Sequence, residues 1–588
     1  MKTSLPLTIA VTGHRDIEAS DVASVDATFR NWLLELVSAY PFTPLRLLTG
    51  LAEGADRMAA RVFCDLRASL IREGNRPASE WEMVAVLPMA EEGYRDDFPE
   101  SVGEFDDLLS QATAVITLSG PSTEDLRAHP ELRVDRYEAL GRRLVRHSNI
   151  LAAFWDGQYI DRRGGASHMV RLKLEGDAEA VSSFSIARHD CGPVWRLPVN
   201  RKSNKNIAGI AEASPQEPVW LYPEGAHLSK VSFEASWRAM DQFNARQQTC
   251  LDPASVEQSV QWLSPSHQAS EDLRQKLGLL DRRTVGVYAA ADIMAMKIEG
   301  RRLWLMRALY GLGGLLALCL WTALDNVLQL WMAAGYVVLV IAIFVGVRKI
   351  RRRELSDDPL SYRFLAEALR VQTYWSIAHV REHPARREAP QGHSENWEAL
   401  RALDSLLSQQ AQEIGWAREA LRIGALDPDC VRNLNDDLRS AHLEHWIKDQ
   451  LSYFKRAERR HEKRIQNIGR ASVACAVLAI VSAAGVVAID VSKLFPEEIR
   501  HFFAIPAAVF PPFALLLESY SDRLALEEQQ KSAIRMQSVF GRAAQAWNGR
   551  RTGARERDHL IRSLGQEALA ECAYWLVLRK SKPTKIPT

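Results

Sequence analysis

Four long apolar runs in the second half of this 588-residue chain constrain its fold more than any other feature. Residues 308–324 and 327–347 are separated by only two residues, and each run approaches the ~20 residues that cross a bilayer. Residues 471–489 and 502–517 repeat the arrangement, although the last run is short and contains three prolines. The pattern predicts two transmembrane hairpins. For the fourth run, a buried core helix of a large soluble domain is the alternative.

Basic residues beside these runs predict their orientation. Lysine and arginine are concentrated at 297–307, 348–353 and 455–470, whereas the loops between paired runs are short and not basic. Basic flanks stay on the cytoplasmic side of a membrane. Both hairpins are therefore expected to point outward, with the N- and C-termini in the cytoplasm. The seven cysteines are scattered without metal-type or disulfide-type spacing, which fits a reducing compartment.

The first half of the chain alternates short apolar runs with helical patterns. The apolar runs are "LTIAVTG", "LRLLTG", "MVAVLP", "AVITLSG", "NILAAFWDG" and "PVWRLPV". This alternation is typical of a parallel sheet covered by helices. We therefore expect an α/β Rossmann-like domain, followed by an all-α membrane domain with two transmembrane hairpins and long cytosolic helices.

The same patterns divide the chain into five expected segments. They are a nucleotide-binding domain at 1–215, a linker with amphipathic helices at 216–300, the first hairpin at 301–355, a cytosolic helical segment at 356–465, and the second hairpin with C-terminal helices at 466–588. The charges are nearly balanced, with 74 Lys and Arg against 73 Asp and Glu, so nucleic acid is not an expected partner.

Glycine-rich turns follow three of the expected strands. Gly13 and Gly50 each end a strand, and Gly164 and Gly165 open a helix after the strand "NILAAFWDG". Glycine lets the backbone approach a ligand closely, and helix N-termini attract phosphate. Because Arg15 and Arg57 lie in or beside these turns, a nucleotide or phosphosugar site is predicted. A structural sheet that uses glycine only for turning is the alternative.

An ordered set of motifs resembles the SLOG superfamily, which includes the Lonely Guy nucleotide hydrolases. The motifs are "VTGHRD", "LLTGLAEGADRMAA", "LPMAEEGYRDDFPESVGEFDDLL", "YEALGRRLV", "AFWDGQ" and "GGASHMV", and they cover roughly residues 5–205. The resemblance implies a nucleotide-derived ligand and no required cofactor. It places at the ligand Gly13, His14, Arg15, Gly50, Glu53, Gly54, Asp56, Arg57, Gly164 and Gly165. The same motifs contain Asp16, Asp156 and Gly157, which complete the candidate site.

The resemblance leaves catalysis open. Hydrolytic members carry a glutamate shortly after the glycine-rich helix opening, but no carboxylate follows Gly165 until Glu175, almost three helical turns later. Glu53 and Asp56 could serve as acids, although residues at a helix start more simply cap N–H groups. His14 could be a general base or only a hydrogen-bonding group. No catalytic residue is assigned, and the sequence contains no metal-binding pattern.

The second half resembles the SLATT group of bacterial two-helix membrane effectors. The resemblance is carried by "WIKDQLSYFKRAERR", "ESYSDRLALEEQQKSAIRMQSVFGRA" and "LGQEALAECAYWLVLRKSKP". It implies a location in the bacterial inner (plasma) membrane and an effector that senses a nucleotide or NAD-derived signal and disrupts the membrane in anti-phage defence. A membrane-tethered nucleotide or NAD N-glycosidase and a scaffold that has lost its ligand are the alternatives.

The expected partners are the lipid bilayer and further copies of the chain. Amphipathic helices at 361–384 and 567–578 each present an apolar face that needs a covering surface. We therefore expect a homo-oligomer. Gly311, Gly313 and Gly314 in the first apolar run would permit the close approach of helices.

Overall fold

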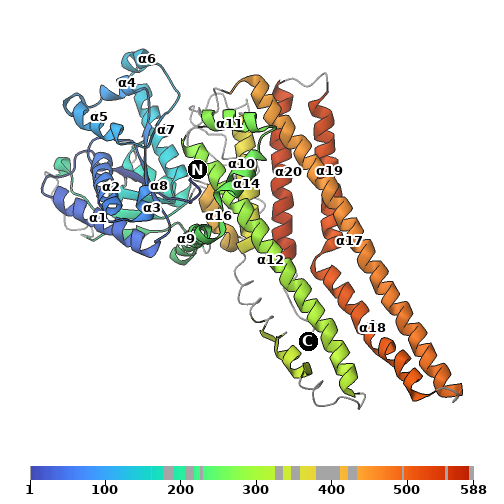
Figure 1. The fold of residues 1–588 in the computed structure, drawn as a ribbon. Coiled ribbons are helices and arrows are strands. Elements are labelled where there is room, and N and C mark those ends of the chain that lie inside the picture. The colour runs from blue at the N-terminus through green and yellow to red at the C-terminus, as the bar shows by residue number, and fades with distance from the viewer. Residues whose placement is uncertain are drawn as a thin grey trace. The chain divides into compact units, whose positions relative to one another are not determined.

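The computed structural model divides the chain into two compact units. Unit 1 comprises Met1–Met294, Ser361–Leu443 and Ala554–Ala573, and unit 2 comprises Ala295–Leu360, Glu444–Gly553 and Tyr574–Thr588. The structure describes residues 2–160, 162–176, 191–204, 217–225, 229–277, 279–324, 335–342, 344–345, 348, 358–378, 411–421, 434–492, 496–549 and 554–581. Each unit is described by itself below (Figure 1).

Unit 1 contains a seven-stranded sheet with the order β4-β3-β2-β1-β5-β6-β7. Its strands are β1 (Leu7–Gly13), β2 (Leu45–Thr49), β3 (Glu82–Leu87), β4 (Ala114–Thr117), β5 (Ile150–Phe154), β6 (Val194–Leu197) and β7 (Val219–Leu221). All neighbouring strands are parallel except β6 and β7. The six apolar runs coincide with β1–β6, which confirms the prediction of a mainly parallel sheet covered by helices. The antiparallel edge strand β7 was not predicted.

Helices cover both faces of this sheet. On one face lie α1 (Val22–Ala39) and α2 (Ala55–Arg72), and Phe29 of α1 packs edge-on against Phe154 of β5. On the other face, α7 (Glu131–His147) and α8 (Ala166–Glu175) share a buried core with the sheet, including Leu140, Met169 and Leu151. Shorter helices lie between these elements: α3 (Arg76–Ser79), α4 (Glu91–Arg95), α5 (Val102–Ser110) and α6 (Thr123–Ala128).

Segment 216–300, for which we expected a linker with amphipathic helices, belongs to the packed part of unit 1 up to Met294. It forms α9 (Lys230–Cys250), α10 (Pro253–Gln261), α11 (His267–Lys276) and the start of α12 (Leu279–Leu324). The Asn244 side chain of α9 accepts a hydrogen bond from the Leu5 amide (2.8 Å) and donates one to the Leu5 carbonyl (2.9 Å). The helix is therefore held against the residues that lead into β1.

The amphipathic helices find their covering surfaces inside the chain. Tyr362, Leu365 and Leu369 of α14 (Asp358–Ala378) are almost fully buried, and so is Leu569 of α20 (Ala554–Ser581). Trp375 Nε1 of α14 donates to a carbonyl of α20 at 3.1 Å. A further helix, α16 (Ala411–Leu421), packs on α9. These faces therefore do not require a second copy of the chain, which removes the reason given above for a homo-oligomer.

Unit 2 contains the apolar runs. Two described stretches are long and apolar enough to cross a membrane, Asp436–Ser492 and Ile499–Trp547. They correspond to α17 (Asp436–Ser492) and to α18 (Glu497–Arg523) together with α19 (Leu526–Trp547). None of the most apolar part of the second stretch is buried, which is contrary to a core helix. Of the second apolar run, 327–347, residues 335–342 and 344–345 are described and helical, and the others lie outside the described residues.

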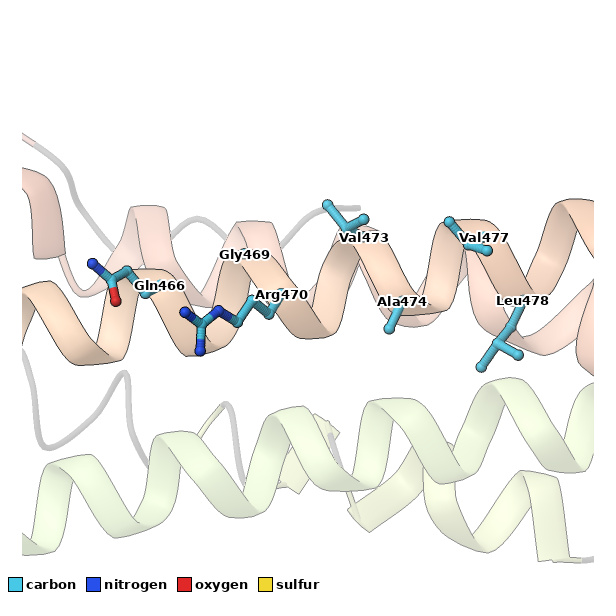
Figure 2. A pocket seen from close by; sticks show the side chains of 7 residues that line it. All are labelled: Gln466, Gly469, Arg470, Val473, Ala474, Val477 and Leu478. Carbon is cyan, nitrogen blue, oxygen red and sulfur yellow. The ribbon is translucent and has the colours of Figure 1, made fainter.

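Within unit 2, small residues allow α18 to approach its neighbours. A Cβ atom at Gly314 of α12 would lie 2.4 Å from the Phe513 ring of α18, and one at Gly485 of α17 would lie 2.6 Å from the Phe503 ring. Of the three glycines predicted to mediate helix contacts, Gly314 meets a helix of the same chain and Gly311 has no described atom within 4 Å of its Cβ position. Figure 2 shows an open, mainly apolar hollow along one side of α17, lined by Gln466, Gly469, Arg470, Val473, Ala474, Val477 and Leu478.

Candidate functional site

The strand order reverses between β1 and β5. We call the region beyond the carboxyl ends of these two strands the β1–β5 crevice, after the general position of ligands in such sheets. From β1 the chain proceeds outward through β2, β3 and β4, and it then returns to the other side of β1 for β5. The last paired residues of these strands are Gly13 and Phe154. In open α/β sheets, ligands bind beyond the carboxyl ends of the two strands where the order reverses. The residues that follow Gly13 and Phe154 are therefore the first candidates for ligand contact.

His14 and Asp156 meet at this point. His14 Nε2 lies 3.1 Å from Asp156 Oδ1 and 3.3 Å from the backbone nitrogen of Asp156. A protonated Nε2 donates to the carboxylate, whereas an unprotonated Nε2 accepts the amide hydrogen. The carboxylate also accepts the amide hydrogen of Gln158 at 3.1 Å. The pair links the loop after β1 to the loop after β5.

Arg15 lies beside His14 and is solvent exposed. Its guanidinium carbon stands 5.0 Å from the centre of the Tyr137 ring, a cation–π distance. The Tyr137 hydroxyl donates to Asp97, which also pairs with Arg133. Arg15 is therefore a charged group at the surface, and its guanidinium packs against the ring of Tyr137.

Asp16 is directed to other partners. Its carboxylate accepts hydrogen bonds from Arg201 Nε at 3.0 Å and Ser203 Oγ at 2.6 Å. Partial burial raises the pKa of Asp16, but these two hydrogen bonds lower it below its ordinary value. The residue ties the loop after β1 to the segment after β6, and its acceptor atoms are used within the protein.

The turn between β2 and α2 has an unusual backbone. Leu51 has φ +53° although it is fully buried and has a Cβ atom, and Gly54 has φ +81°. A Cβ atom at Gly54 would lie 2.5 Å from the carbonyl oxygens of His14 and Arg15. Glycine at position 54 therefore allows the start of α2 to contact the loop after β1. Strained backbone of this kind is concentrated at functional sites.

Acidic side chains already occupy the start of α2. Asp56 is buried, and its Oδ2 atom accepts the amide hydrogen of Gly50 at 3.1 Å. Burial raises the pKa of Asp56 to about 6, and hydrogen bonds from the backbone of Ala52 and Gly50 limit the rise. Glu53 accepts a hydrogen bond from Ser101. Two carboxyl groups at this helix start act against the binding of a phosphate there.

Arg57 does not reach the crevice in this structure. Its side chain is 1% exposed, and Nε donates to the Leu51 carbonyl at 3.0 Å. Nη1 donates to the backbone and side chain of Ser101 and pairs with Glu104 at 3.1 Å, while the guanidinium packs 4.5 Å from the Phe98 ring centre. Arg57 thus holds the strained turn to the segment that precedes α5, a role that the sequence pattern did not indicate.

The start of α8 differs from the start of α2. Gly165 is the N-cap residue, and the first turn of α8 contains no acidic side chain. Gly164, with φ +73°, donates its amide hydrogen to His168 Nδ1 at 3.1 Å. Arg163, in the preceding loop, pairs with Glu138 of α7 at 2.6 Å. Of the three predicted phosphate turns, this one keeps a helix N-terminus without a carboxylate of its own.

Two predicted glycines are explained by protein contacts. A Cβ atom at Gly13 would lie 2.4 Å from the Cβ atom of Ala55 and 2.8 Å from that of Phe154. At Gly157, with φ +92°, a Cβ atom would lie 2.2 Å from the Arg196 guanidinium. The absence of a side chain at these positions is needed for packing, so glycine here carries less information about a ligand than we inferred.

Sequence reasoning missed the aromatic part of the site. Tyr94 is buried and donates from its hydroxyl to the Gly50 carbonyl at 2.9 Å, and Tyr137 supports Arg15. Both lie inside motifs that the sequence analysis singled out, "EEGYRDD" and "YEALGRRLV". In each motif a tyrosine lies near glycine and acidic residues, and this was the only signal in the sequence. Neither motif by itself indicates that the tyrosine ring lies next to the glycine-rich turns.

Comparison with protein-family models and with curated proteins found no match. Among the described residues, no group of three or more His, Cys, Asp or Glu side chains is arranged to hold a metal ion. The functional argument therefore depends on the sheet topology and the side chains at the β1–β5 crevice.

Proposed function

We propose that this protein is a membrane-anchored receptor whose Rossmann-like domain binds a nucleotide or NAD-derived anion between the ends of β1 and β5. The observation that carries the proposal is the reversal of strand order at this point, where His14 and Asp156 meet. The ligand's phosphate would lie at the start of α8, and Arg15 would neutralise part of its charge.

The anchoring of unit 2 in a membrane is supported by exposure and length. Along α17, Val473, Ile480 and Val487 are each more than 60% exposed, as expected of side chains that face lipid. Three prolines within α18 leave its helix continuous. Prolines are tolerated in transmembrane helices because neighbouring helices and polar side chains satisfy the freed carbonyl groups.

The proposed output is a change in the membrane part. By its resemblance to SLOG and SLATT proteins, the chain would act in the bacterial inner membrane, with cytoplasmic termini, as an anti-phage effector that opens a pore or disrupts the bilayer. A homo-oligomer remains part of this proposal, because the described apolar helices of one chain are too few to enclose a wide aqueous path.

One observation favours the second candidate, a membrane-tethered nucleotide or NAD N-glycosidase. His14 and Asp156 form a hydrogen-bonded pair at the ligand crevice, which is the arrangement of a general base oriented by a carboxylate. Glu53 and Asp56 are engaged at the start of α2, so this pair is the strongest candidate for proton transfer in the described site.

The test is equilibrium binding with the full-length protein purified in detergent. A panel of adenine nucleotides, NAD and ADP-ribose is titrated by calorimetry, and the mixtures are then analysed by chromatography for cleaved products. Binding without turnover supports the receptor, and turnover lost in His14→Gln supports the glycosidase. Arg15→Gln should weaken binding, while Arg72→Gln, which removes an exposed arginine at the far end of α2, should not. If no nucleotide binds, the proposal is wrong.

A further inference from the structure

A cationic surface precedes the apolar run of α17. Between residues 455 and 470 this helix carries seven exposed basic side chains and two glutamates, Glu458 and Glu462. The basic residues are Lys455, Arg456, Arg459, Arg460, Lys463, Arg464 and Arg470, which we call the basic segment. The segment ends immediately before the apolar run that begins at Ala471.

The seven side chains of the basic segment outnumber the two glutamates of the same stretch and form no ion pair within it. No described carboxylate lies within ion-pair distance of any of its seven members. Two exposed arginines of unit 1 show the contrast: Arg163 pairs with Glu138 at 2.6 Å, and Arg127 pairs with Asp96 at 2.9 Å. A helix surface on which unpaired basic side chains outnumber acidic ones by seven to two attracts an anionic partner.

Contacts within unit 2 locate the boundary of the apolar zone. Tyr310 Oη of α12 lies 3.2 Å from Ser519 Oγ of α18, and its ring is 5.2 Å from that of Tyr520. Ser472 of α17 lies within 3.5 Å of Glu518. These polar and aromatic groups of three helices are thus at one level, directly after Arg470. Tyrosine is enriched at the level of lipid headgroups.

An ion pair marks the other end of the apolar run of α17. Arg500 Nε of α18 lies 2.8 Å from Asp490 Oδ1 of α17, beyond the apolar run. Twenty residues separate Arg470 from Asp490, which corresponds to ~30 Å of helix, the thickness of the hydrocarbon core. Figure 2 shows the change of character at the first boundary, where Gln466 and Arg470 are followed by Val473, Val477 and Leu478.

This placement brings the basic segment to the headgroup layer. The layer is about 5–7 Å thick on each side of the hydrocarbon. Arg464 precedes Arg470 by about 9 Å of helix, and a long basic side chain can extend toward the membrane surface. Members farther along the helix act through their field, which reaches about 8 Å at physiological ionic strength.

We propose that the basic segment of α17 binds anionic phospholipid headgroups in the adjoining leaflet and selects them over zwitterionic ones. Clusters of four to eight basic residues beside a transmembrane helix are suited to this recognition. The inference rests on the membrane part of the proposed function and is independent of nucleotide binding. A polyanion such as RNA would satisfy the same charge, but the segment adjoins the apolar run, where phospholipid phosphates are already concentrated.

The experiment measures lipid preference of the full-length protein. Detergent-purified protein is delipidated and mixed with equal amounts of phosphatidylglycerol and phosphatidylcholine, and the bound lipids are counted by native mass spectrometry. The test variant is Lys463→Gln/Arg464→Gln/Arg470→Gln. The matched control, Lys531→Gln/Arg535→Gln/Arg542→Gln, removes the same charge from exposed positions of α19.

We expect the unmodified chain and the control to prefer phosphatidylglycerol over phosphatidylcholine by on the order of tenfold or more. The test variant should lose most of this preference. Added salt should reduce the preference. Equal binding of the two lipids by the unmodified chain, or full preference in the test variant, would overturn the proposal. The proposal would also be overturned if RNA co-purified with the unmodified chain and the control but not with the test variant, and if none of the samples showed a lipid preference. Nucleotide titration of the same samples reports separately on the receptor function.

Discussion

Arg283 Nη1 lies 3.0 Å from Glu82 Oε2, and both side chains are almost completely buried. Arg46 of β2 pairs with the same carboxylate oxygen at 2.7 Å. Glu82 begins β3, whereas Arg283 belongs to the first turns of α12, 201 residues later in the chain. The ion pairs therefore anchor the start of α12 to the amino end of the sheet within unit 1.

Removing the shared carboxylate should destabilise unit 1. In Glu82→Gln, the buried Arg46 loses the carboxylate with which it pairs, and Arg283 keeps only the half-exposed Glu80, at 2.9 Å. Breaking a buried ion pair in this way costs about 3–5 kcal/mol. Asp106→Asn, which breaks an exposed pair with Arg95, should cost at most about 1 kcal/mol. Chemical unfolding followed by tryptophan fluorescence measures both changes. Equal stability of the two variants would show that the buried cluster contributes nothing.

Asp56 should make the stability depend on pH. Burial raises the pKa of its carboxyl from 3.8 to about 6 in the folded chain, so the folded state binds a proton that the unfolded state has lost between these values. The Asp56 contribution to the free energy of unfolding therefore falls as pH rises from about 4 to about 6, and it is constant above that. In Asp56→Asn this part of the decline should disappear. An unchanged pH profile of thermal unfolding in the variant would contradict the assignment.

Gly13 should be intolerant of any side chain. The added Cβ atom of Gly13→Ala would collide with the Cβ atoms of Ala55 and Phe154, and overpacking of this kind costs about 1–3 kcal/mol. The sequence placed Gly13 at a ligand, but the structure predicts that substitution here lowers stability through the protein's own packing. Gly103→Ala is the control, because no described atom lies within 4 Å of its Cβ position and it is in helix α5. Thermal unfolding should separate the two variants.

Arg15 and Arg57 should give opposite results, although the sequence suggested one role for both. Arg15→Gln removes an exposed cation and should weaken nucleotide binding roughly 10- to 100-fold, the value of one charge-assisted hydrogen bond, without lowering the melting temperature. Arg57→Gln should lower the melting temperature, because Leu51, Ser101 and Glu104 lose their partner. A stable Arg57→Gln protein, or unchanged affinity in Arg15→Gln, would refute this division of roles.

The sequence alone was sufficient for the sheet. Parallel strands covered on both faces consist of nearly continuous apolar residues, and the runs that form β2, β3 and β5 are completely buried. The apolar runs of α17 and α18 were also predictable from the sequence, because they are longer and more apolar than those of helices at the surface of soluble proteins. Strand β7 was not predictable, since it has three residues and pairs antiparallel to β6 at the edge.

Only the tertiary structure decided what the candidate site residues do. Arg15 lies in the loop after β1 and Arg57 in the first turn of α2. The segment around Phe98 and Ser101 covers Arg57, whereas Arg15 packs against Tyr137 and stays exposed. Burial and pairing of a side chain are set by groups tens to hundreds of residues away in the chain. A local motif determines the direction of the backbone at a turn, and it contains no information about which distant group fills the space beside it.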